Sequence, residues 1–132
     1  MSKKSSAATG GNEARKNTIR RLEKLPLLRE KLADDKALLA ELQGNKQIQR
    51  EYVERLKVEI AKTTSEISQM ERALRRIAND PYYVTITGKY FEQMTDAAIA
   101  DQIHCDTTTV WRNRNRLLCR LTILIYGAEA VS

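Results

Sequence analysis

The sequence contains little of the chemistry that enzymes and metal sites need. It has one histidine, His104, and two cysteines, Cys105 and Cys119, among 132 residues. The histidine directly precedes one cysteine and the other lies fourteen positions further on, a spacing that matches no zinc motif. Two cysteines cannot form a disulfide framework either, so we expect each to pack as a small apolar residue in a reducing compartment.

Other absences narrow the class of protein further. The five glycines form no glycine-rich phosphate loop, and no nucleophile stands beside a plausible base. The longest apolar runs are too short to span a membrane, and no secretory leader is evident. The sequence therefore predicts a cytoplasmic protein that is not an enzyme and has no cofactor, no metal and no membrane contact.

Composition indicates exposed helices and an acidic partner. Aromatic residues make up only 5% of the chain, whereas charged residues make up 30%. The formal net charge is +6 and the pI is about 9.5, which favours nucleic acid or another anionic partner.

The first segment, residues 1–17, is rich in Ser, Gly, Ala and Lys. Such a composition buries too little apolar surface to offset its ordering entropy, so we expect a disordered basic tail. It is either a solvated start of the chain or an arm whose cations, Lys3, Lys4, Arg15 and Lys16, contact phosphates.

Residues 18–79 are predicted to form a helical, coiled-coil arm, because apolar residues recur with alternating spacings of three and four. One phase contains Leu25, Leu32, Leu39, Val53, Ile60, Ile67 and Leu74. The partner phase contains Leu28, Leu42, Leu56, Met70 and Ile77.

The middle of this arm permits two architectures. Asp35, Lys46 and Gln49 interrupt the apolar pattern, and Gly44-Asn45 is a plausible helix end. A helical hairpin that turns there is slightly favoured, because apolar residues off the seam, such as Ile48, widen the stripe. The alternative is one continuous helix of about 60 residues, since the phase is preserved across Gly44.

A separate domain is predicted over residues 80–127, followed by a short tail, 128–132. Asp80 and Pro81 form a good helix start, and we expect a helix that ends near Gln93, although YYVTITGKYF also has strand propensity. The fold class is therefore all-α, with a long arm followed by a C-terminal helix-turn-helix domain.

The helix-turn-helix is predicted over residues 95–121. Thr95 caps a short helix whose inward face holds Ile99, Ala100 and Ile103, and His104 stands where many such turns have glycine. Asp106 or Thr107 caps the second helix, and Val110 lies ten residues after Ala100. This spacing is typical of motifs whose second helix enters the DNA major groove.

The outward face of the second helix carries groups that bond base edges and phosphates. Arg114 falls nearer the buried side, where we expect it to reach a phosphate or an acidic partner. Trp111 either covers the hydrophobic edge of the domain or contacts a base or sugar. The candidate DNA-binding residues are Thr107, Thr108, Thr109, Trp111, Arg112, Asn113, Asn115, Arg116 and Arg120.

A family resemblance rests on the same stretch. The chain has DPYY at 80–83, then Tyr90, Asp96, Ile99-Ala100, the run TVWRNRNRL at 109–117 and LIYG at 124–127. This pattern resembles the ArpU/RinA-type regulators of phage late transcription, whose helix-turn-helix is similar to the promoter-reading domain of sigma factors. The resemblance covers about residues 78–127 and implies a DNA-binding activator inside a bacterial host cell.

These observations give a leading hypothesis and two alternatives. The leading one is a sequence-specific regulator of phage or prophage late genes that binds double-stranded DNA as a homo-oligomer, with a dimer favoured. Its arm would pair copies or contact RNA polymerase. The alternatives are a small-terminase-like subunit that recognises phage DNA for packaging, and a coiled-coil adaptor that does not bind DNA.

Overall fold

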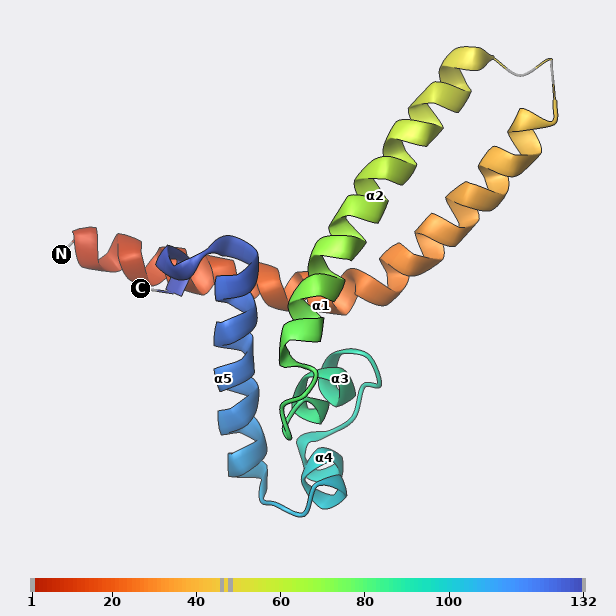
Figure 1. The fold of residues 1–132 in the computed structure, drawn as a ribbon. Coiled ribbons are helices and arrows are strands. Elements are labelled where there is room, and N and C mark those ends of the chain that lie inside the picture. The colour runs from red at the N-terminus through yellow and green to blue at the C-terminus, as the bar shows by residue number, and fades with distance from the viewer. Residues whose placement is uncertain (1, 46, 48, 132) are drawn as a thin grey trace.

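A computed structural model describes residues 2–45, 47 and 49–131, with side chains from residue 12 onward. Every regular element in these ranges is a helix, which confirms the all-α fold class (Figure 1). The elements are α1 (Ser2–Gln43), α2 (Arg50–Ile77), α3 (Val84–Tyr90), α4 (Asp96–Gln102), α5 (Thr107–Tyr126) and a short 3-10 helix, η1 (Ala128–Val131).

The chain reverses between α1 and α2, so the two helices form a hairpin rather than one continuous helix (Figure 1). α1 ends at Gln43, and Gly44 follows in a turn closed by a hydrogen bond from Asn45 N to Leu42 O at 3.1 Å. The expectations for Lys46 and Ile48 lie outside the described residues.

α1 changes direction partway along, which divides it into two parts (Figure 1). Pro26 lies inside the helix. A proline has no N–H to donate, and its ring crowds the carbonyl one turn earlier, so it bends a helix. The first part of α1 passes α5 and η1, whereas the second part runs beside α2. We call residues 27–43 and 50–62 the arm.

The expected disordered tail is wrong for residues 2–17, which belong to α1. The composition of this segment indicates little burial. It does not show that these residues extend the part of α1 that packs on α5. The contact is close: Thr18 and Thr122 are both fully buried, and their hydroxyl oxygens are 2.9 Å apart. A helix that is nucleated at this contact extends without a second nucleation cost. Met1 and the side chains of Lys3 and Lys4 lie outside the described residues.

The C-terminal tail also differs from the expectation, because residues 128–131 form η1 against α1. Ser132 lies outside the described residues. The helix expected from Asp80 begins later, at Val84. Instead of capping a helix, Asp80 accepts a hydrogen bond from Tyr82 N at 2.9 Å and so forms a turn.

One hydrophobic core joins the two regions that the sequence divides at residue 80. Its fully or almost fully buried members come from α1, α2, α3 and α5, so the two hairpin helices and the C-terminal helices share one interior. They are Leu22, Leu25, Ile67, Met70, Ala73, Leu74, Ile77, Ile86, Leu117, Leu118 and Leu121. The heptad residues Leu25, Ile67, Met70, Leu74 and Ile77 are thus part of this core. They lie at the end of the hairpin next to α3 and α5, which we call the base.

The arm is different, because none of its described residues is buried. Its heptad residues are half-buried between the two helices, and Leu27, Tyr52 and Val58 are exposed. The arm therefore depends on the base of the hairpin for its position.

The base is buried and the arm is exposed, so we expect leucine-to-alanine substitutions only two residues apart to have different effects on stability. Leu25 is 0% exposed and Leu27 is 63% exposed. Leu25→Ala should reduce the free energy of unfolding by about 2–5 kcal/mol, through lost burial and a cavity. Leu27→Ala should change it by less than about 0.5 kcal/mol. Urea unfolding followed by circular dichroism measures both, and equal effects would contradict this packing.

Candidate nucleic-acid interface

The end of the molecule opposite the arm is built from two capped helices. The Thr95 hydroxyl accepts a hydrogen bond from Ala98 N at 3.1 Å and caps α4. The Asp106 carboxylate accepts from Thr109 N at 2.7 Å and caps α5. Hydrogen bonds from the Thr109 side chain and backbone lower the pKa of Asp106. Both caps fall where the sequence predicts helix starts, and the residue that caps α5 is Asp106 rather than Thr107.

The turn between α4 and α5 uses a left-handed residue, as the sequence predicts. His104 has φ 57°, a region that glycine, asparagine, aspartate and histidine tolerate best. The turn is closed by Cys105 N, which donates to Ala100 O at 3.0 Å. Behind it, Ile99, Ala100 and Val110 form a small second core, so the two helices pack on each other.

α3 approaches α4 closely because Gly88 has no side chain. A Cβ at this position would lie 3.1 Å from Met94 Sδ and 3.2 Å from Ile99 Cγ1. Gly88 O also accepts a hydrogen bond from Met94 N at 2.8 Å. The α3–α4 connection is thus held against the end of α3.

Arg114 connects α3, α4 and α5. It points inward from α5 and is only 5% exposed. Its Nε donates to Thr85 O at 2.9 Å, and its Nη2 lies 2.5 Å from Asp96 Oδ1. The guanidinium lowers the pKa of the Asp96 carboxyl. The acidic partner considered for Arg114 in the sequence is therefore Asp96, in the first turn of α4.

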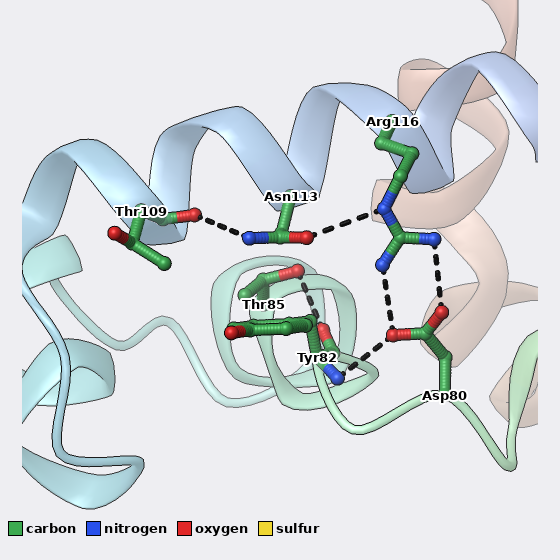
Figure 2. Close-up of polar contacts among 6 residues, drawn as sticks. All are labelled: Asp80, Tyr82, Thr85, Thr109, Asn113 and Arg116. Atoms are coloured by element: carbon green, nitrogen blue, oxygen red, sulfur yellow. Dashed lines mark hydrogen bonds and ion pairs between the residues drawn. The ribbon is translucent and has the colours of Figure 1, made fainter.

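Arg116 is held by the loop that follows α2 (Figure 2). Its two terminal nitrogens each lie 2.9 Å from a different carboxylate oxygen of Asp80, and this pairing lowers the pKa of Asp80. Its Nε donates to Asn113 Oδ1 at 3.2 Å, and Asn113 Nδ2 donates to Thr109 O at 2.9 Å. Three of the candidate residues therefore form one chain of contacts along α5.

Asn115 does not face outward as predicted. It is half-buried, and its side-chain oxygen accepts a hydrogen bond from Arg15 of α1. The sequence analysis included Asn115 among the outward-facing candidates, but α1 packs on that side of α5. The prediction that Asn115 lies away from the core of the C-terminal helices is correct. The side chain is nevertheless covered by α1, in the segment that the sequence analysis predicted to be a tail.

The remaining candidates lie at the surface. Thr107, Thr108, Arg112 and Arg120 are exposed, and Trp111 is 59% exposed. Among the described residues, none forms a hydrogen bond or ion pair with the guanidinium of Arg112 or Arg120. The exposed residues of the first turns of α5 stand at the end of the molecule farthest from the arm (Figure 1).

Sequence reasoning missed several residues that position this surface. It read Asp80 as part of a helix start, used Asp96 only in the family resemblance, and put Arg15 in a tail. Only the inward angle of Arg114 indicated an internal partner. The described residues contain no group of three or more potential metal ligands, and no described helix is long and apolar enough to cross a membrane.

Comparison with protein-family models, with curated proteins and with solved structures found no match for this chain.

The buried position of Arg114 predicts a stability effect specific to that residue. Arg114→Met should lower the free energy of unfolding by about 1–3 kcal/mol, because it removes the hydrogen bond to Thr85 O and leaves Asp96 without its cation. Arg114→Lys should restore little, since one ammonium cannot replace the planar fork.

The matched control is Arg112→Met, two residues earlier on the same helix. Because Arg112 is exposed and unpaired, its replacement should change stability by less than about 0.5 kcal/mol. Thermal or urea unfolding of the three variants measures the difference. If Arg114→Met and Arg112→Met are equally stable, the connecting role of Arg114 is wrong.

Proposed function

We propose that this chain is a sequence-specific regulator of transcription that binds double-stranded DNA through α4 and α5 and has no enzymatic activity. The observation that carries the proposal is the outward position of Thr107, Thr108, Trp111 and Arg112 on the first turns of α5, which packs against α4. In such motifs the N-terminal residues of the second helix contact base edges in the major groove.

The chemistry of these side chains fits that role. Arginine can bond the O6 and N7 atoms of guanine with two hydrogen bonds, and threonine can contact the thymine methyl group or hydrogen-bond a base. The exposed indole of Trp111 can contact a sugar or base. We assign base recognition to Thr108 and Arg112 and leave Asn115, which Arg15 binds, out of the recognition set.

Arg116 and Arg120 have a different proposed part. Arg116 is paired with Asp80, so it positions α5 against the loop after α2. Arg120 is exposed one turn later, and we assign it a contact with the phosphate backbone. Such contacts position a protein on DNA without reading the base sequence.

The biological setting follows from the family resemblance. The residues shared with ArpU/RinA-type regulators, particularly the run at 109–117, include the exposed Arg112 and the Asp80–Arg116 pair. We therefore propose that the protein acts in the cytoplasm of a bacterial host, as an activator of phage or prophage late genes.

Base recognition by Arg112 predicts a loss that depends on DNA sequence. Arg112→Ala should weaken binding to a duplex selected in vitro by about 1–3 kcal/mol, roughly 5- to 150-fold, and relax the preference at one base pair. Binding to random duplex should fall much less. Fluorescence anisotropy titrations on both duplexes provide the measurement.

Arg55→Ala is the control, since Arg55 is exposed on the arm and forms no described ion pair. It should bind both duplexes like the unmodified chain. Equal losses for Arg112→Ala on the selected and random duplexes would make Arg112 a phosphate contact instead.

The arm supports a second element of the proposal, pairing with another copy of the chain. Its apolar stripe includes Leu32, Leu39, Leu42, Val53 and Leu56, all of which stay half-exposed in a single chain. Two arms packed together would bury this stripe as a four-helix bundle. Pairing would also supply two recognition helices for two half-sites, which a single short motif needs for high affinity. Contact with RNA polymerase is the other role that an exposed arm could have.

The pairing proposal predicts the mass of the protein in solution. Light scattering should give twice the chain mass of 15.1 kDa. Leu39→Asp, in the half-buried stripe, should halve that mass while the helices of the base stay folded. Ala40→Asp places the same group at the neighbouring exposed position and should keep the double mass. A single-chain mass for the unmodified protein would contradict pairing.

A further inference from the structure

A second basic surface lies where α2 passes α5. A shallow groove of about 450 Å³ is lined by one residue of α5 and five of α2, and we call it the α2–α5 groove. The lining residues are Gln69, Arg72, Ala73, Arg75, Arg76 and Leu124.

The charge of this groove is of one sign. Arg72, Arg75 and Arg76 are all exposed, and none of them has an ion pair or side-chain hydrogen bond to a described residue. By contrast, Arg21, Arg114 and Arg116 each have an acidic partner in the same structure. Like charges one turn apart, such as Arg72 and Arg76, repel each other, so this cluster favours an anion from outside the chain.

The α2–α5 groove continues the exposed flank of α5. Arg112, Arg116, Arg120 and Leu124 follow one another at intervals of four, so they form one row along the helix. Arg120 follows Arg116 by one turn, and Arg116 is paired with Asp80 in the loop after α2. Leu124, the last of the row, lines the groove.

The distances along this row suit duplex DNA. At 1.5 Å per residue, Leu124 lies about 18 Å along the helix axis from Arg112. The major groove is about 12 Å wide, so a helix whose first turns lie in it passes over the bordering phosphates further along. Arginines at that position would meet the backbone rather than the bases.

We propose that the α2–α5 groove binds the phosphate backbone of duplex DNA beside the major groove that α5 enters. This inference rests on the function proposed above and adds a second, sequence-independent contact to it. Arg72 and Arg76 would each direct a guanidinium at a phosphate, a pairing that arginine forms with two hydrogen bonds.

DNA fits this surface better than an acidic protein does. Stable protein interfaces have an apolar centre, often with aromatic anchors, but the groove offers only Leu124 and Ala73 beside its cations. The row that links it to Arg112 also points to the same partner for both surfaces.

The salt dependence of binding tests the proposal. Arg72→Ala/Arg76→Ala is compared with the full-length unmodified chain on a selected duplex and on a random duplex, each of about 30 base pairs, or three helical turns. The slope of log K against log salt should become shallower by about 1–2, because each lost phosphate contact removes nearly one counterion. Affinity should fall by the same factor on both duplexes, so that the preference for the selected one is retained.

Arg50→Ala/Arg55→Ala is the matched control. It also replaces two exposed, unpaired arginines of α2, but these lie in the arm and not in the groove. It should keep the original slope. An unchanged slope for Arg72→Ala/Arg76→Ala, while Arg112→Ala still weakens binding to the selected duplex, would overturn the groove proposal and leave the proposed function standing. Equal loss of slope in both double variants would overturn it too, since net charge would then explain the effect. No binding of the unmodified chain to either duplex would instead defeat the proposed function.

Discussion

The guanidinium of Arg114 is almost fully enclosed, with a backbone oxygen of α3 on one side and the first-turn carboxylate of α4 on the other. Burying a cation is costly unless it is paired and hydrogen-bonded, and both conditions are met here. Because Arg114 of α5 contacts Thr85 O of α3 and Asp96 of α4 at once, it holds the three helices together. The caps at Thr95 and Asp106 then set where α4 and α5 begin.

With α5 held in this way, its different sides contact different parts of the molecule. Asn115 and Thr122 meet α1, and Arg116 meets Asp80 in the loop after α2. The first turns, with Trp111 and Arg112, remain exposed at the end of the molecule. The same helix is therefore both a core element and the candidate reading surface, and the core that it enters also contains residues of α1 and α2 outside the arm.

Local signals were sufficient to predict much of this structure. The caps, the left-handed His104 and the buried Val110 and Leu117 follow from residue type and spacing. Long-range contacts were not predictable in this way. The partners Arg15–Asn115, Thr18–Thr122 and Asp80–Arg116 are separated by 100, 104 and 36 positions, and no periodicity links them. For that reason the tail was predicted disordered, Asn115 was assigned to the reading face, and the boundary at residue 80 missed the shared core.

Trp111 offers the most direct test of where DNA lies, because it is the single tryptophan of the chain and stands beside Arg112 on the exposed turns of α5. The measurement is acrylamide quenching of its fluorescence, without DNA and with saturating selected duplex. If α5 enters the major groove, bound duplex should shield the indole and sharply reduce the quenching constant. An unchanged quenching constant, under conditions where a mobility shift shows that the protein is fully bound, would place the DNA elsewhere and contradict the account.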